Sequence, residues 1–294
     1  MFRVFLSISL IIAVQFSHAD IEEIDDGGYT VRLSQPAQRI VSLAPNITEI
    51  LFYIGAGKQI VGADEYSNYP PPAKDIMRVN NHATANYELI LSLQPDLVIA
   101  WQSGNGETVI NRIRELGIPI FLVETRHLDD IPNLYLQLGR LTGQSAYSQE
   151  KAQQFVHRLK KLRASNKTKP AIKAFYQVWS DPLITLNGEH IISDVIALCG
   201  GKNIFSQAIP LVPYVNIESL LAANPQVIIA GGGEQERQKQ ILKWQQWPSI
   251  SAVSNQHIFT IPADLMQRHS ERILDGAEIM CRHFDHARSS LLPR

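Results

Sequence analysis

The sequence has 294 residues, a formal net charge of −1 and a hydrophobic fraction of 45%. A chain of this size can bury a large core and is long enough for two domains. Acidic and basic residues are mixed along it, which excludes the basic stripe that a nucleic-acid-binding protein would carry.

The N-terminus has the parts of a secretory signal peptide. Arg3 supplies a positive charge, and residues 4–14 form a largely apolar run. Within residues 17–19, small side chains stand at the two positions that signal peptidase recognises before its cleavage site. A largely apolar run of eleven residues is too short to cross about 30 Å of hydrocarbon, which argues against a membrane anchor. We therefore expect cleavage before Asp20 and a mature protein that is soluble in the periplasm.

Strands and helices alternate after this leader. β-rich apolar runs lie at 39–43, 60–63 and 118–123, and helical patterns lie at 47–54 and 108–116. Asn46 and Glu49 have the spacing of a capping box for the first of these helices. Such alternation favours parallel sheets covered by helices.

A pattern of fifteen residues occurs twice, at 86–100 and at 216–230. Four positions match in kind: Asn86 and Asn216, Glu88 and Glu218, Leu91 and Leu221, and Pro95 and Pro225. In each copy we expect the Asn to cap a short helix, the Glu to lie in its first turn and the Leu to face inward. The Pro then ends the helix before a buried strand. Two distant copies predict two lobes of similar architecture rather than a solenoid.

Residues 148–165 form a polar helical pattern that ends at 167–170, and a new strand starts at 171. A helix of this length between two lobes would act as a stiff connector. The predicted fold is α/β, with two Rossmann-like lobes of mostly parallel sheets joined by a single long helix. Its expected parts are a signal peptide at 1–19, an N-terminal lobe at 20–144, the connecting helix at 145–169 and a C-terminal lobe at 170–294.

The chain has two cysteines, Cys199 and Cys281. In an oxidising compartment an isolated pair predicts one disulfide, which would tie the last helix to its own lobe. The alternative is a metal site, because residues 281–286 gather Cys, His and Asp. Structural zinc usually draws on paired ligands at short spacings, so the disulfide is favoured and no metal site is predicted.

Four motifs, at 39–49, 66–71, 95–101 and 199–205, resemble those of the periplasmic binding proteins of the helical-backbone class. That class serves ABC importers for cobalamin, haem and ferric siderophores. The tyrosine-rich second motif, Trp101 and the placement of the cysteines are most similar to the cobalamin (vitamin B12) branch. The resemblance covers the mature chain. It implies a monomer that has no resident cofactor, carries cobalamin as its ligand and docks on the permease dimer of an inner-membrane transporter.

The resemblance also implies a ligand site in the cleft between the lobes. Its candidate residues are Tyr66, His82, Trp101, Ile184, Val212, Asp264 and Arg268. Of these, Tyr66 and Trp101 match aromatic residues that contact cobalamin. Asp264 and Arg268 match a pair that hydrogen-bonds its polar edge, although their spacing also fits a simple helical ion pair. Glu88 and Glu218 match the glutamates that each lobe presents to arginines of the permease.

Three candidates depart from the family pattern. His82, Ile184 and Val212 stand where the best-known cobalamin binder has aromatic residues, and Tyr214 and Tyr87 lie close enough in sequence to compensate. A neutral His82 imidazole is able to ligate cobalt or haem iron, or it is a polar loop residue. Haem is therefore the second ligand to consider. A ferric siderophore would call for several cleft arginines, and a bare metal ion for ligands in both lobes.

The rival class is an exported α/β hydrolase or redox enzyme. The sequence has no G-x-S-x-G, H-E-x-x-H, C-x-x-C or Walker motif, and no G-x-G-x-x-G after a strand. Residues 231–233 are three glycines after a strand, but they lack the spacing of a nucleotide-binding loop. We therefore expect a binding protein and not an enzyme.

Overall fold

The computed structural model describes residues 20–81, 84–232 and 234–291. The predicted signal peptide and His82 lie outside the described residues. No helix within these three ranges is both long and apolar enough to cross a membrane.

The N-terminal lobe is built on a parallel sheet of five strands in the order β5-β4-β3-β6-β7. Its strands are β3 (Ile40–Ser42), β4 (Ile60–Asp64), β5 (Arg78–Asn80), β6 (Leu97–Trp101) and β7 (Ile120–Val123). An antiparallel hairpin precedes them, formed by β1 (Ile21–Ile24) and β2 (Thr30–Leu33). The helices are α1 (Pro45–Tyr53), α2 (Tyr87–Ser92), α3 (Gln102–Glu115) and α4 (Asp130–Leu141), with 3₁₀ turns at Gly57–Gln59 and Pro71–Asp75.

Both faces of this sheet are buried. Along β6, Leu97 and Ile99 join one hydrophobic cluster, whereas Val98 and Ala100 join another. Successive side chains of a strand point to opposite faces, so an apolar run of this kind is what a sheet covered on both sides requires.

The C-terminal lobe has a parallel sheet of four strands in the order β11-β8-β12-β13. These strands are β8 (Ile172–Gln177), β11 (Gly201–Asn203), β12 (Val227–Gly231) and β13 (Ile258–Ile261). A short hairpin, β9 (Trp179–Ser180) and β10 (Leu183–Ile184), follows β8. The helices are α6 (Ile191–Leu198), α7 (Ile217–Ala223), α8 (Glu234–Trp244), α9 (Ser251–Ser254), α10 (Ala263–Gln267) and α11 (Ile273–Leu291).

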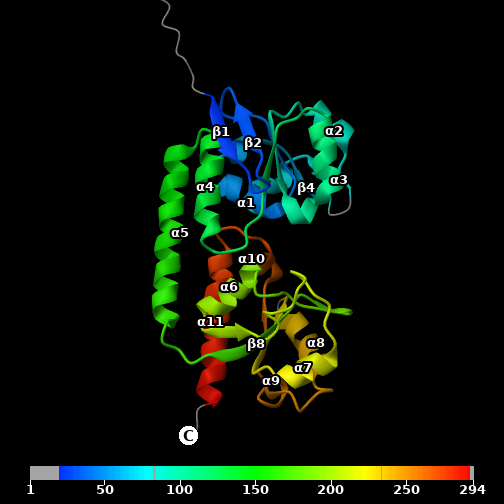
Figure 1. Ribbon diagram of the computed structural model, residues 1–294, viewed down its shortest axis with the longest axis vertical. Helices are drawn as coiled ribbons and strands as arrows, with labels where there is room; N and C mark the ends of the chain where they lie inside the picture. The colour runs from blue at the N-terminus through cyan, green and yellow to red at the C-terminus, as the bar shows by residue number, and fades with distance from the viewer. Residues whose placement is uncertain (1–19, 82–83, 233, 292–294) are drawn as a thin grey trace, which may run out of the picture.

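Helix α5 (Ser145–Asn166) connects the lobes and runs along one side of both, as Figure 1 shows. It packs on α4 in the N-terminal lobe, which is the upper lobe in Figure 1, and the C-terminal lobe is the lower one. There the centroid of the Phe155 ring lies 5.9 Å from that of the buried Tyr135 ring. Further along, the Arg158 guanidinium binds Asp275 at 2.6 Å and Glu278 at 2.8 Å, both on α11. The predicted fold, two α/β lobes with parallel sheets and one long connecting helix, is confirmed.

The repeat also appears in three dimensions. The side chain of Asn86 accepts a hydrogen bond from the Leu89 amide at 3.0 Å, and Asn216 accepts one from Ser219 at 2.8 Å. Each helix ends at a residue with positive φ directly before the proline: Gln94 at 47° and Asn224 at 46°. The two segments are thus the same capped helix, turn and strand.

Two local predictions were wrong. Leu91 is 44% exposed and does not face inward, whereas Leu221 packs against the hydrophobic cluster of its lobe as predicted. The fully buried residues of the two short helices are Ile90 and Leu220. Consecutive helical residues point about 100° apart, so a shift of one position changes the face. Helix α1 begins at Pro45 with Ala44 as its N-cap, which makes no side-chain capping bond, so residues 46 and 49 do not form a capping box. Pro is well suited to that first helical position.

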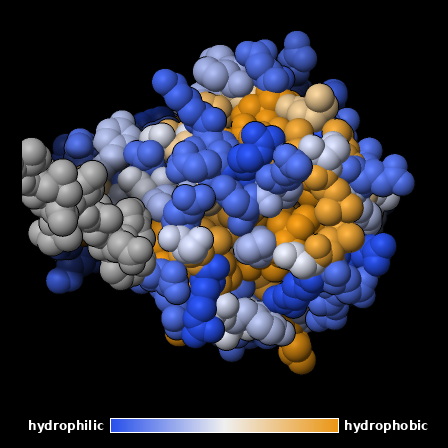
Figure 2. Space-filling model, turned by 90° about the horizontal axis from the view of Figure 1, so that it is seen from above, coloured by the Kyte–Doolittle hydropathy of each residue, from blue (hydrophilic) through white to orange (hydrophobic). Residues whose placement is uncertain are grey.

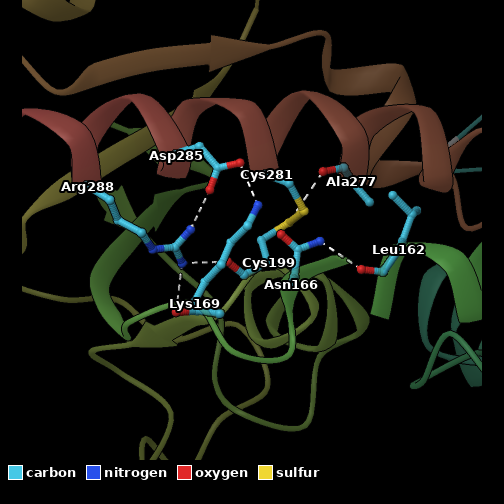
Figure 3. Close-up of a disulfide and its surroundings, with 9 residues drawn as sticks. Leu162, Asn166, Lys169, Cys199, Ala277, Cys281, Asp285 and Arg288 are labelled. Atoms are coloured by element: carbon cyan, nitrogen blue, oxygen red, sulfur yellow. Dashed lines mark hydrogen bonds and ion pairs between the residues drawn. A yellow bond between two sulfur atoms is a disulfide. The ribbon is translucent and has the colours of Figure 1, made fainter. Parts of the chain in front are cut away.

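The predicted disulfide between Cys199 and Cys281 is present and joins the end of α6 to α11 (Figure 3). Beside it, Arg288 donates hydrogen bonds to the carbonyls of Cys199 and Gly200 at 2.6 and 3.0 Å and pairs with Asp285 at 2.8 Å. Because both thiols are oxidised, they are not free to hold a metal. In the described part of the chain, no group of three or more His, Cys, Asp or Glu side chains is placed to bind a metal ion.

Candidate functional site

The carboxyl ends of the two parallel sheets supply the loops that meet between the lobes. In the N-terminal lobe Tyr66 follows β4, Trp101 ends β6 and Thr125 follows β7. In the C-terminal lobe α10 and Arg268 follow β13. Ligands of open α/β sheets bind outside the carboxyl ends of the strands, so this region is where a ligand site is expected.

An aromatic junction joins the lobes here. The Trp101 indole from the upper lobe meets the His269 ring edge-on, with centroids 5.6 Å apart, and His269 meets His190 at 5.5 Å. The Thr125 hydroxyl is hydrogen-bonded to Nδ1 of His269 at 3.1 Å. These residues line a crevice of only about 10 Å³, which is too narrow for any organic ligand. We call the residues that line this crevice the floor of the region between the lobes.

Both histidines of this floor are neutral near pH 7. Burial lowers the pKa of His269 to about 3, and burial together with the smaller effect of the Arg126 charge lowers the pKa of His190 to about 4. The Nδ1 atom of His190 accepts a hydrogen bond from the Ile192 amide, which requires an unprotonated nitrogen. Two uncharged imidazoles beside Trp101 give the base of the cleft an apolar character.

A buried ionic cluster forms the second junction. The side chain of Glu49 is 0% exposed, and its carboxylate belongs to the upper lobe. From the lower lobe it accepts hydrogen bonds from Nη1 of Arg268 and Nη1 of Arg272, both at 2.9 Å, and from Oγ of Ser270 at 2.6 Å. We call these four residues the Glu49 cluster. It fixes the segment after α10 against helix α1.

The carboxyl group of Glu271, next to Ser270 and Arg272 of the Glu49 cluster, has a raised pKa. Burial, together with the smaller effect of the negative charge on Glu49, raises the pKa of Glu271 to about 7. The loss of hydration on burial outweighs the opposing effect of the Arg272 charge, so Glu271 holds its proton more strongly than a solvated carboxyl group does.

Arg268 links the cluster to the predicted ligand residues. It binds Asp264 at 3.0 Å, as its helical spacing predicts, and donates to Oδ1 of Asn68 at 2.8 Å. Asn68 belongs to the same loop as Tyr66, and the Tyr66 ring is 50% exposed. The structure thus brings the Tyr66 loop, Trp101, Asp264 and Arg268 to one region. Arg268 itself is largely buried, whereas the Asp264 side chain remains half exposed.

Comparison with known proteins supports this interpretation. A family model described as periplasmic binding protein matches residues 40–265, which is most of the chain. The chain belongs to the periplasmic binding protein family.

Among its relatives in this family is the vitamin B12-binding protein of Vibrio cholerae, 39% identical over 255 residues, or 84% of this chain and 89% of that one. The protein of the same name from Vibrio campbellii is 35% identical over 86% of this chain and 91% of that one. The crystal structure of the periplasmic vitamin B12-binding protein of V. cholerae superposes with a TM-score of 0.81 at 38% identity, covering 86% of this chain and 98% of that chain. A periplasmic haem-binding protein of Roseiflexus shares the fold, with a TM-score of 0.75 at 23% identity over 85% of this chain and 99% of that chain.

The remaining family candidates within the described residues are not among those that line the floor. Ile184 is part-buried in β10, and Val212 is exposed on the segment that pairs with β10. Glu88 and Glu218 are both exposed, each as the second residue of its helix. In Figure 1 their helices, α2 and α7, lie in different lobes on the side away from α5.

Two larger surface cavities of the described part of the chain are lined by none of the candidate residues. One of about 500 Å³ lies between α4 and α5, and one of about 430 Å³ lies beside the end of α5 and α6. The candidate ligand surface is instead the lobe junction itself, where Tyr66 and the Asp264 side chain are half exposed. Sequence reasoning missed His190, His269 and the role of Glu49, because each acts through a partner in a distant segment.

Proposed function

We propose that this protein binds cobalamin in the cleft between its lobes and delivers it to an ABC importer in the inner membrane. The observation that carries the proposal is the convergence of Tyr66, Trp101, Asp264 and Arg268 at the lobe junction, in a chain 39% identical to a vitamin B12-binding protein. Cobalamin is the cargo, so the proposal includes no resident cofactor and no catalytic step.

The chemistry of the cleft suits this ligand. A corrin is a broad plate with apolar faces and an amide-bearing rim, and it needs apolar walls with a few polar groups. The exposed Tyr66 ring offers one wall, and the half-exposed Asp264 carboxylate can accept hydrogen bonds from the amides of the rim. Helix α5 and the Glu49 cluster hold the lobes in a fixed relation, which favours a preformed site.

Calorimetric titration of the mature protein, residues 20–294, with cyanocobalamin tests the proposal. We expect binding of one cobalamin per chain and no binding of hemin in a parallel titration. Binding of hemin alone, with a Soret shift that is lost in His82→Ala, would move the function to haem uptake.

We infer that residues 1–19 direct export and that the mature chain works in the periplasm as a monomer. Docking on the permease dimer would use the exposed Glu88 and Glu218, one on each lobe. Figure 2 shows hydrophobic side chains gathered among charged ones on the outer end of the upper lobe, and helix α2 exposes Leu91 beside Glu88. A surface of this mixed kind fits a transient, salt-sensitive contact.

Reversal of both charges, in Glu88→Lys/Glu218→Lys, is expected to abolish cobalamin uptake because the permease arginines would meet lysines. Affinity for cobalamin in calorimetry should remain that of the wild type, since both residues lie outside the cleft. Glu115→Lys/Glu150→Lys, which reverses two other exposed glutamates, is the matched control and should transport normally. Normal uptake by the first variant would rule out this docking mode.

A further inference from the structure

A three-stranded ribbon forms the edge of the lower lobe. Strand β10 is its centre, with β9 on one side and residues 211–215 on the other. The Val215 amide donates to the Leu183 carbonyl at 3.0 Å, and the Thr185 amide donates to the Pro213 carbonyl at 3.1 Å. In this register Ile184 stands directly opposite Trp179 on one neighbour and opposite Tyr214 on the other.

Residues directly opposite each other project from the same face of a sheet, and alternate residues project from the other face. Leu183 and Val215 pack against the hydrophobic cluster of the lower lobe, so their face is turned inward. The row formed by Trp179, Ile184 and Tyr214 therefore points away from the lobe. Trp179 is 60% exposed and Tyr214 is 74% exposed.

This outward face adjoins the cleft. Leu211, which projects from the inward face at the start of the same ribbon strand, lines the crevice of the floor together with Trp101 and His269. Its neighbour Val212 projects from the outward face, so the outward row begins beside this crevice. In Figure 1 the green hairpin of β9 and β10 lies at the edge of the lower lobe that is nearest to the upper lobe. Val212 lies two residues from Tyr214 and is also exposed, which extends the apolar surface toward the floor.

The indole of Trp179 is held in place although it is exposed. Its Nε1 donates a hydrogen bond to the Asp181 carbonyl at 2.9 Å within the hairpin turn. A fixed aromatic side chain loses little conformational freedom when a ligand covers it, which favours binding. Neighbouring exposed aromatic side chains on a folded protein mark an interaction surface.

We propose that Trp179 and Tyr214 are the ligand-contacting aromatic residues of the C-terminal lobe. They flank Ile184 and adjoin Val212, the two positions at which this chain lacks the aromatic side chains expected from the family resemblance. The aromatic side chains of this lobe thus stand at positions next to the expected ones, and we call Trp179 and Tyr214 the aromatic wall. This inference rests on the proposed function, because the wall is assigned to the apolar face of the corrin.

Titration of Trp179→Ala/Tyr214→Ala with cyanocobalamin tests the inference. We expect the affinity to fall about 10- to 100-fold, because each ring contributes contact area and stacking to the macrocycle. Trp179→Phe/Tyr214→Phe keeps both rings and should bind within a few-fold of the wild type. Tyr147→Ala, which removes an exposed tyrosine from α5, is the control for nonspecific loss and should leave the affinity unchanged.

Both rings are exposed, so the alanine variant should unfold at the wild-type temperature, and circular dichroism checks this. Wild-type affinity in the double alanine variant would overturn the inference while leaving the proposed function intact. If the wild type binds hemin and not cobalamin, the proposed function fails, and the same variants titrated with hemin still decide whether the wall contacts the ligand. A wild type that binds neither macrocycle contradicts both.

Discussion

Glu49→Gln is expected to lower the free energy of unfolding by about 3–5 kcal/mol, because it leaves Arg272 without its carboxylate and Arg268 with only the half-exposed Asp264. The wild-type carboxylate is fully buried and receives three hydrogen bonds from the other lobe. Water cannot replace these partners at a site closed by both lobes. Urea denaturation of the mature protein at neutral pH measures the effect.

The same variant should weaken cobalamin binding, since Arg268 would lose the contact that orients it between Asp264 and Asn68. Glu115→Gln is the matched control, because its partner Arg112 is exposed and the pair lies on the surface of α3. We expect no measurable change there, as for most surface ion pairs. A double-mutant cycle with Arg272→Gln isolates the pairwise energy, and a coupling energy near zero would contradict the role given to Glu49.

The lobes and their connection were predictable because their signals are local. Asn86 and Asn216 cap their helices as expected, and the apolar runs after Pro95 and Pro225 form buried strands. In the first copy the inward-facing residue was placed one position too far along, at Leu91 instead of Ile90, whereas Leu221 of the second copy does pack against its lobe. A helix of six or seven residues has too few turns for its hydrophobic pattern to define a face.

The site was predictable only in part. The pairing of Asp264 with Arg268 follows from helical spacing, and the resemblance placed both near Tyr66 and Trp101. Glu49 was assigned to a capping box because its actual partner, Arg268, lies 219 residues away in the sequence. Trp179 gave no signal, since its exposure depends on strand pairing in a ribbon that local patterns do not define.

Removal of the disulfide, in Cys199→Ala/Cys281→Ala, should lower the free energy of unfolding by about 2–5 kcal/mol. The two cysteines are 82 residues apart, so the bridge restricts a large loop in the unfolded chain. For a loop of this size the chain-entropy estimate is about 4.5 kcal/mol. Denaturation of the variant, and of the wild type with and without reductant, measures this difference.

The folded state of the variant should change little. Arg288 still donates to the carbonyls of Cys199 and Gly200 and still pairs with Asp285, so α6 and α11 keep a second connection. We therefore expect an unchanged circular dichroism spectrum and a cobalamin affinity close to that of the wild type, together with a lower denaturation midpoint. An equal midpoint for the variant and the oxidised wild type would show that the bridge does not stabilise this lobe. If the variant is fully folded but no longer binds cobalamin, the disulfide instead shapes the cleft.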